Sequence, residues 1–451
     1  MKIYVLKQNK ALGFLEEPAV DNIHFTYFDE VKPENYLEGI EDKKNVSDNG
    51  LFLIFQNMFP ENGQIEAIKS KHGLSTTIEL LLYLEDVHGS YAFLTQEAYD
   101  SHRDVKHANY AYSEIKDEVL DNGYTFPNIL NHALNIPENK RFPGTTINSK
   151  VIGLSGFQYK FSITKEDRGN ELCINKDGTS HYFMKPYSKY NTTFASHDKE
   201  RLYIPYLLIN EHLFMTLARD SGFAVPYNAI IKDGEDYHYV IKRYDRYKNE
   251  KFDHEEFATL MGYNSATKYD ASVQEVLEKA NEYISKNALE ELLLFFYFSA
   301  VIGHGDLHAK NISLIHTSNA IGEKCKELSP YYDISTTHIY KGLKDRDIGL
   351  KMLGRKSKIK KEHFLQLAAR YNIDPVGFEK KMKDITDIFV SVFPKYIQAL
   401  PDEILDLPYR RKYGAHSPLK SILEKYYMER KDYIKRCIDT DWIEDTHDIF
   451  S

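Results

Sequence analysis

Tryptophan and cysteine are scarce in this sequence, which has one tryptophan and three cysteines in 451 residues. The cysteines, Cys173, Cys325 and Cys437, lie far apart, so the chain has no C-x-x-C pair and no zinc knuckle or dithiol redox motif of that kind. Three cysteines also suit a disulfide framework poorly, because each bridge uses two. We therefore expect a protein of a reducing compartment.

Long apolar runs are also missing. The longest, at about residues 292–302, is too short to span a bilayer, and residues 1–7 are too short and polar for a secretory signal. The formal net charge of −9 argues against autonomous binding of nucleic acid, which usually needs a basic face. We expect a cytoplasmic protein without membrane association.

What remains is the composition of an ordinary globular protein, with 42% hydrophobic and 28% charged residues. The length is sufficient for two or three domains with substantial cores. The 34 tyrosines and 25 phenylalanines predict that these cores are rich in aromatic side chains.

Apolar periodicity predicts a mixed chain of helices and strands. Residues 1–100 resemble a small module for packing or partner binding, and the chain from about residue 253 onward is mainly helical. Strands are expected at residues 3–6, 11–15, 23–28, 181–185 and 237–242. Helices are expected at residues 64–72, after Ser75, and at residues 199–221.

The most informative stretch is residues 302–315, I-G-H-G-D-L-H-A-K-N-I-S-L-I. Apolar residues stand on both sides of it, so a polar loop between a buried helix and a buried strand is predicted. Asp306 and Asn311 have the spacing that phosphoryl transfer requires, with a carboxylate to accept a hydroxyl proton and an amide oxygen to hold Mg²⁺. Asp333 offers a second carboxylate for the metal. The alternative is a charged surface loop with a structural Asp.

Two weaker motifs precede this loop. In residues 153–160, glycines on both sides of Leu154 and Ser155 would let backbone N–H groups approach phosphates, although an ordinary hairpin turn fits equally well. Lys185 ends a short strand, where it suits the phosphates of ATP, and Glu211 lies inside a helical pattern from which it could orient that lysine. Solvated or boundary-face side chains are the alternatives for both.

The interpretation of two further segments depends on the motifs around them. Residues 237–246 form a strand that runs into a charged turn, the place where a two-lobed kinase would read adenine. Residues 346–361 contain seven Lys and Arg and precede an amphipathic helix. Most charge runs are solvated faces, and a surface that faces phosphate or nucleic acid is the alternative.

Together, four motifs resemble the HipA family of serine/threonine-protein kinases, which act as toxins of bacterial toxin–antitoxin modules. The motifs are Leu154-Ser155-Gly156-Phe157-Gln158-Tyr159-Lys160, Arg243-Tyr244-Asp245-Arg246, Asp306-x-His308-Ala309-Lys310-Asn311 and Leu328-Ser329-Pro330-x-Tyr332-Asp333. They follow the order and spacing of the family. Residues 55–63 are similar to its N-terminal signature, so the resemblance extends over most of the chain.

The resemblance implies an α+β, two-lobed protein-kinase-like fold. Its parts would be an N-terminal subdomain (residues 1–100), the rest of the N-lobe (101–245) and a helical C-lobe (246–451). ATP and Mg²⁺ would be the cofactors. The catalytic residues would be Asp306, as the base, and Lys310, and the metal ligands would be Asn311 and Asp333. The nucleotide would be bound by Ser155, Gly156, Phe157, Gln158, Lys160, Lys185, Lys242, Arg243, Tyr244, His308 and Tyr332.

The resemblance also implies regulation and partners. Family members inactivate themselves by phosphorylating a serine of the Gly-rich loop, and Ser155 is the only serine between Gly153 and Lys160. The expected partners are a helix-turn-helix antitoxin similar to HipB, DNA only through that antitoxin, and a protein substrate such as an aminoacyl-tRNA synthetase.

Two other function classes remain open. His304-Gly305-Asp306-Leu307-His308 with Asn311 also resembles the loop of aminoglycoside and choline phosphotransferases, which modify small molecules. Those enzymes lack the loop at residues 154–160 and the N-terminal module. A non-catalytic co-repressor that acts with a DNA-binding partner is the other class, and the intact Asp306, Asn311 and Asp333 argue against it.

Overall fold

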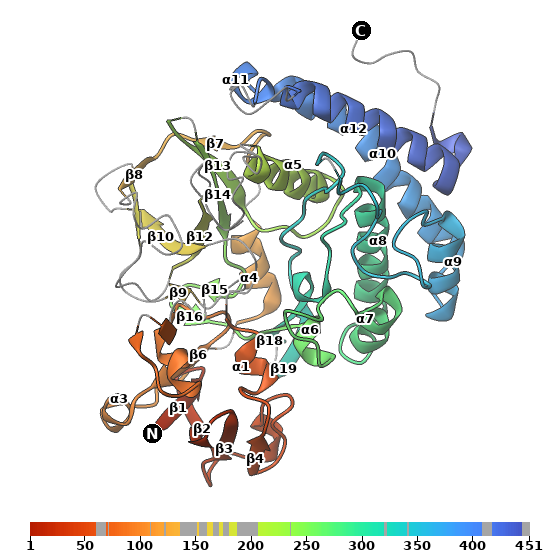
Figure 1. Cartoon of the computed structure of the whole chain (residues 1–451). Coiled ribbons are helices and arrows are strands. Elements are labelled where there is room, and N and C mark those ends of the chain that lie inside the picture. Colours follow the sequence, from red (N-terminus) through yellow and green to blue (C-terminus); the bar gives the residue numbers. More distant parts are fainter. Residues whose placement is uncertain are drawn as a thin grey trace.

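The computed structural model of the chain describes residues 1–59, 69–70, 72–108, 110–120, 123–135, 151–152, 160–165, 171–174, 180–186, 206–234, 236–319, 323–340, 342–407 and 417–443. Figure 1 shows three regions. An N-terminal module, red and orange, lies at the bottom of the view, a sheet lies at the upper left, and most of the helices lie at the right. No described helix is long and apolar enough to cross a membrane.

The N-terminal module is an antiparallel sheet of strand order β4-β3-β2-β1-β6 with short helices against it. Its strands are β1 (Lys2–Lys7), β2 (Lys10–Ala19), β3 (Asn22–Tyr27), β4 (Lys44–Ser47) and β6 (Tyr91–Leu94). In β3, Ile23, Phe25 and Tyr27 alternate with less buried residues and point into the core, as the period of two requires. The strands expected at residues 3–6, 11–15 and 23–28 are therefore confirmed.

The helix expected after Ser75 is a 3₁₀ helix, η2 (Ile78–Tyr83), and not an α-helix. The Glu79 carboxylate accepts hydrogen bonds from the backbone N–H groups of Ser75 and Thr76, at 3.0 and 2.8 Å, and this turn holds the chain just before η2. The other helices that the structure describes in the module are η1 (Pro33–Asn35), α1 (Leu53–Gln56) and α3 (Gln96–Asp100). Most of the helix expected at 64–72 lies outside the described residues.

The second region is a seven-stranded sheet of order β7-β13-β14-β12-β10-β11-β8. Its strands are β7 (Ile129–Leu130), β8 (Ala133–Asn135), β10 (Phe161–Lys165), β11 (Glu171–Ile174), β12 (Tyr182–Lys185), β13 (Asn228–Asp233) and β14 (Asp236–Lys242). Helix α5 (Leu207–Asp220) packs against β13 and β14, and it lies beside them in Figure 1. Helix α4 (Tyr112–Val119) and the strand pair β15 (Arg246–Tyr247) and β16 (Glu250–Lys251) lie near the end of β14.

The third region is mostly helical. It comprises α6 (Phe257–Leu260), α7 (Val273–Ala280), α8 (Lys286–Ile302), α9 (Lys361–Arg370), α10 (Pro375–Ala399), α11 (Asp402–Leu405) and α12 (Leu419–Tyr433). A small sheet joins β17 (His254–Glu256), β18 (Ser313–Ser318) and β19 (Lys324–Leu328). The helical prediction missed β19, because its sequence Lys-Cys-Lys-Glu-Leu has only one strongly apolar residue and its pairing with β18 defines it.

One large core includes α5 together with α8, α10 and α12, so the second and third regions are packed through a shared apolar layer. The N-terminal module has its own core, which runs from Ile3 to Tyr91. A strand pair, β5 (Leu84–Glu85) with β9 (Val151–Ile152), connects that module to the segment that leads into the Gly-rich stretch.

Candidate functional site

The polar loop at residues 303–311 begins where α8 ends. Gly303 has a φ of +68°, a conformation that favours glycine, and a Cβ atom there would lie 2.4 Å from Cδ2 of His338. The hydroxyl groups of Thr336 and Tyr426 donate to the carbonyl of Ile302, at 2.7 and 2.8 Å. This carbonyl in the last turn of α8 has no partner within the helix, and side chains from distant segments supply its hydrogen bonds. The loop therefore starts from a fixed point.

Asp306 is the exposed member of this loop. The Tyr269 hydroxyl donates a hydrogen bond to its Oδ1. Tyr269 was not predicted as a site residue, since nothing in the local sequence distinguishes it from the other 33 tyrosines. An exposed carboxylate that a hydroxyl donor holds in position is suited to meet a substrate hydroxyl that arrives from solution.

Asn311 precedes β18 and Asp333 follows β19, so both residues lie near the open end of the β18–β19 hairpin. The Asn311 Nδ2 donates to Asp333 Oδ2 at 3.2 Å, and its Oδ1 accepts from the backbone N–H of His308 at 3.1 Å. Asp333 has a φ of +58°, a strained conformation for a residue with a side chain. One carboxylate and one amide oxygen fit Mg²⁺, which commonly takes one or two protein ligands and completes its shell with phosphates and water. Neither here nor elsewhere in the described residues does a group of three or more His, Cys, Asp or Glu lie together so that it could hold a metal ion.

Lys185, at the end of β12, lies between two carboxylates. Its Nζ is 2.7 Å from Oε1 of Glu211 on α5 and 2.6 Å from Oδ1 of Asp333. Lys185 and Glu211 are 3% and 4% exposed, so the ion pair is shielded from water. We call Lys160, Lys185, Glu211 and Asp333 the site cluster.

Burial and charge drive the pKa values of the site cluster apart. Burial raises the pKa of Glu211 to about 7, against the opposing effect of Lys185. Burial opposes the charged form of Asp333 too, but Lys185 and Lys160 together hold the pKa of Asp333 well below its usual range. Burial and the nearby Lys185 lower the pKa of Lys160 to about 8. Carboxylates with such divergent pKa values are characteristic of functional sites.

A cavity beside the end of β14 adjoins the site cluster. Its walls include Lys160, Phe183, Tyr244, Glu256 and Tyr332. The rings of Tyr244 and Tyr332 stack with centroids 5.5 Å apart. The stacked rings give the cavity a flat aromatic wall, and charged residues such as Lys160 and Glu256 line it as well.

A larger cavity, of about 540 Å³, lies elsewhere on the sheet. It is lined by residues of the core on the face away from α5, among them Ile163, Leu172 and Val240. Of the predicted site residues that the structure describes, only Lys242 lines it. We therefore place the candidate site at the smaller cavity, next to the site cluster.

His308 and Lys310 are both buried, and they face different ways. Burial, with the positive charge of Lys268, lowers the pKa of His308 well below its usual value, and its Nδ1 has no hydrogen-bond partner among the described residues. Such an orphaned polar atom is free to bind a ligand. Lys310 instead donates to the hydroxyl of Ser265 at 3.0 Å and the carbonyl of Asn57 at 3.4 Å.

The side chains of Lys242 and Arg243 are held by structural partners, although both residues also line the cavity. Lys242 donates to the carbonyl of Glu118 at 3.0 Å. Arg243 pairs with Asp86 of the N-terminal module at 2.8 Å and with Asp245 at 2.9 Å. A nucleotide would therefore meet the backbone at these two positions. Of the other sequence-predicted residues, Ser155, Gly156, Phe157 and Gln158 lie outside the described residues.

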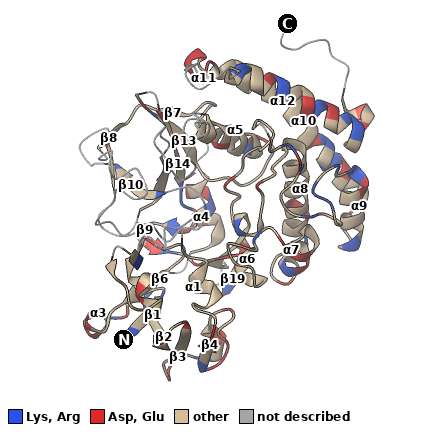
Figure 2. Ribbon diagram, viewed as in Figure 1, with Lys and Arg blue, Asp and Glu red and all other residues tan. Residues whose placement is uncertain are grey.

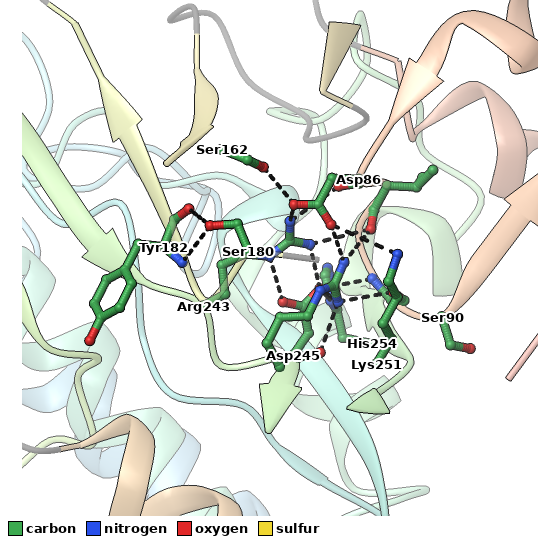
Figure 3. Close-up of polar contacts among 12 residues, drawn as sticks. Asp86, Ser90, Ser162, Ser180, Tyr182, Arg243, Asp245, Lys251 and His254 are labelled. Atoms are coloured by element: carbon green, nitrogen blue, oxygen red, sulfur yellow. Dashed lines mark hydrogen bonds and ion pairs between the residues drawn. The ribbon is translucent and has the colours of Figure 1, made fainter. Parts of the chain in front are cut away.

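Asp86 is the centre of a second group of charges, which the sequence did not predict. Figure 3 shows its carboxylate facing Ser162 of β10 and the guanidinium of Arg243. Arg246 completes the ring at 3.0 Å from Asp86 and 2.9 Å from Asp245. The paired arginines hold the pKa values of both carboxylates below the usual range although burial opposes this. We call Asp86, Arg243, Asp245 and Arg246 the hinge cluster.

Comparison with known proteins places this geometry in a family. The sequence profile described as "HipA-like C-terminal domain" matches residues 152–395, more than half of the chain. The protein named "Putative kinase Y4dM" from Sinorhizobium fredii is 28% identical over 271 residues, which cover 56% of this chain and 62% of that protein. One named "Putative kinase" from Haemophilus influenzae is 25% identical over 206 residues, 42% of this chain and 54% of that one. The chain thus spans about half to three fifths of these relatives.

Among solved structures, the chain is similar to one from Shewanella oneidensis, described as a toxin–antitoxin system of HipA, HipB and operator DNA. The TM-score is 0.61, with 15% sequence identity, over 96% of this chain and 97% of that one. At this identity the likeness shows the fold alone. The predicted α+β, two-lobed kinase-like fold is confirmed.

Proposed function

The chain belongs to the family of the HipA-like C-terminal domain, and from that premise we propose that it is an ATP- and Mg²⁺-dependent kinase that phosphorylates serine or threonine in a protein. The observation that carries the proposal is the meeting of Lys185 with both Glu211 and Asp333 at 2.7 and 2.6 Å. A strand lysine oriented by a helix glutamate and placed beside a metal-binding aspartate is the arrangement that kinases use at the ATP phosphates.

In this proposal Asp306 accepts the proton of the substrate hydroxyl. The hydroxyl oxygen bonds to the γ-phosphorus of ATP, the bond from that phosphorus to the bridging oxygen breaks, and ADP leaves. Asn311 and Asp333 would hold Mg²⁺, which would offset the negative charge of the phosphates. Lys185 contacts the phosphates, and Glu211 orients it.

The remaining predicted residues shape the nucleotide pocket. Tyr332 and His308 line it, and residues Lys242 to Tyr244 contribute backbone at the adenine edge. Ser155, Gly156, Phe157, Gln158 and Lys160 would cover the phosphates. Lys310 supports the catalytic loop through its bonds to Ser265 and Asn57, a positioning role.

Family membership also supports a toxin role. The similar Shewanella protein was solved with HipB and operator DNA. We propose that this chain has a helix-turn-helix antitoxin similar to HipB, contacts DNA only through it, and phosphorylates a protein such as an aminoacyl-tRNA synthetase. Expression alone in bacteria should inhibit growth, and an adjacent antitoxin gene should relieve it. Harmless expression of both the wild type and Asp306→Asn would remove the basis for this role.

Self-inactivation at Ser155 completes the proposal. A phosphate adds about −1.5 to −2 charges at pH 7 and would repel the γ-phosphate of ATP. Phosphopeptide mapping after incubation with Mg-ATP tests both the activity and the position. We expect a phosphate on Ser155 in the wild type and none in Asp306→Asn. Transfer to an aminoglycoside or choline without any labelled protein would instead favour a small-molecule phosphotransferase, and failure to bind Mg-ATP in calorimetry would favour a co-repressor.

A further inference from the structure

A loop rich in Lys and Arg is fastened directly to the catalytic loop. We call residues 345–358 the basic loop; it carries Arg346, Lys351, Arg355, Lys356 and Lys358. Its Gly349 donates a backbone hydrogen bond to the carbonyl of His304 at 3.1 Å, and a Cβ atom at Gly349 would lie 2.2 Å from the carbonyl oxygen of Leu307. The two loops therefore touch through backbone atoms.

The basic loop is held rigid. The backbone N–H groups of Met352 and Arg355 each donate to the carbonyl of the other, at 2.7 and 2.9 Å, and Asp347 accepts from the backbone of Lys358 at 2.6 Å. The guanidinium of Arg430, buried on α12, donates to the same Asp347 at 3.0 Å. Cations on such a preorganised loop lose little conformational entropy when they bind a partner.

Two cations of the basic loop reach the surroundings of Asp306. Nζ of Lys356 donates to the carbonyl of Tyr269 at 3.3 Å, and the hydroxyl of Tyr269 donates to Asp306. On the other side, a Cβ atom at Gly305 would lie 2.9 Å from Cγ of Arg346. Lys356 is thus linked to Asp306 through Tyr269, and Arg346 packs against Gly305, the residue before Asp306.

The positive charges in this region exceed the local negative charge. Burial and repulsion by Arg346 and Lys351 lower the pKa of Lys356, although Asp270 and Asp345 oppose the shift. Arg346 itself pairs with Asp345 at 3.1 Å in an exposed contact, which contributes little. Figure 2 shows Lys and Arg along the chain that leads into α9. An anion would relieve this repulsion.

We propose that the basic loop binds acidic side chains next to the phosphorylated hydroxyl, so that the substrate of this kinase is a serine or threonine in an acidic segment of a protein. The inference rests on the proposed kinase function. A protein segment fits better than RNA, because the net charge of the chain is −9 and acidic residues interrupt the basic loop, whereas RNA needs an extended basic track.

The test uses the full chain with Mg-ATP and short alanine-based peptides that carry one central serine. The residues beside the serine are Asp, Ala or Lys. We expect the Asp peptides to have a kcat/KM about fivefold to tenfold higher than the Ala peptides, as two or three exposed ion pairs would give, and the advantage should shrink as salt is added.

A double variant, Arg346→Gln with Lys356→Gln, tests whether these two cations cause the preference for Asp peptides. It should raise KM for the Asp peptide while KM for the Ala peptide changes little, so that the ratio approaches one. The matched control, Lys380→Gln with Lys395→Gln on exposed positions of α10, should keep the preference. A merely structural role of the two cations would alter both peptides alike and would overturn the inference.

Four further outcomes are decisive. Equal labelling of Asp and Ala peptides overturns the inference and leaves the kinase function intact, as does self-phosphorylation without labelling of any peptide. Binding of an RNA oligonucleotide that Arg346→Gln and Lys356→Gln abolish would assign the basic loop to nucleic acid, against the proposal. Absence of any transfer, to peptides or to the protein itself, overturns both this inference and the proposed function.

Discussion

The hinge cluster is buried and the site cluster is partly buried, and both contain two carboxylates and two cations, yet their electrostatic balance differs. In the hinge cluster each carboxylate touches both arginines, and both carboxylate pKa values are held low. In the site cluster the pKa of Asp333 is lowered while that of Glu211 is raised to about 7. The number of partners for each charge, not the residue types, produces this difference.

The comparison indicates two kinds of use. A group whose charges are all paired within the protein holds segments together, here the N-terminal module and the end of β14. A group in which one carboxylate lacks a full complement of partners can exchange them for a ligand at lower cost. We therefore assign the hinge cluster to structure and the site cluster to chemistry.

The largest effect on stability should come from removing one arginine of the hinge cluster. Arg246 is fully buried, and Arg246→Met would leave Asp86 and Asp245 with one arginine between them. We expect a loss of about 3–5 kcal/mol in the free energy of unfolding, measured by urea denaturation. Arg370→Met, which cuts an exposed pair with Glu278, should cost about 1 kcal/mol or less. Equal losses in the two variants would refute the structural assignment.

Substitution of the proposed catalytic base or metal ligand should act mainly on activity. Asp306→Asn removes the proton acceptor, and Asp333→Asn removes a metal ligand, so each should lower kcat about 10²-fold or more. Thermal unfolding of Asp306→Asn should stay close to the wild type, because Asp306 is exposed, whereas Asp333→Asn also removes a charged partner of the buried Lys185 and should lower the unfolding temperature. Asp384→Asn, at an exposed position on α10, serves as the control. Full activity in either site variant would disprove the corresponding role.

The carboxylates of the hinge cluster and Glu211 of the site cluster should also respond to pH in opposite directions. The carboxylates of the hinge cluster have lowered pKa values, so their stabilisation is present above about pH 4 and is lost as the pH falls. Glu211 has a raised pKa, so its contribution is full at low pH and is lost between about pH 4.5 and 7.

Glu211→Gln isolates the second effect. Relative to this variant, the wild type should lose stability on the order of 1 kcal/mol as the pH rises from 5 to 8. Urea denaturation across that range measures it, with Glu41→Gln at an exposed position as the control. A constant difference between wild type and Glu211→Gln would show that Glu211 keeps an ordinary pKa.

The smallest effect concerns Asp306, which is exposed and belongs to neither cluster. Tyr269→Phe removes its hydroxyl donor, and a single hydrogen bond to a charged group supports a decrease in kcat of about threefold to tenfold. Steady-state kinetics measure it. Tyr283→Phe, at a tyrosine that follows α7 in the chain and lies beside Lys279 and Lys326, should leave kcat unchanged. A loss as large as that of Asp306→Asn would mean that Tyr269 does more than position the carboxylate.

Local patterns predicted many elements of this fold. The sequence changes from apolar to polar at Gly303 and back to apolar at Ile312, which predicted a loop between a helix and a strand. The structure has helix α8 before this loop and strand β18 after it, as predicted. Prediction failed where a contact with another segment defines the element, as in β19, which pairs with β18. It also gave no sign that Asp86, in the N-terminal module, reaches Arg243.

The sequence alone determined the helices and strands that carry a periodic apolar pattern, because periods of 3.6 and 2 decide which side chains face a core. It also supplied Asp306, Asn311, Asp333 and Lys185 as candidates. Only the tertiary structure decided which of them meet: Lys185 and Asp333 are 148 residues apart in the chain and 2.6 Å apart in space. The charge state of Glu211 is decided there as well, because a pKa depends on burial and on neighbours that distant segments bring.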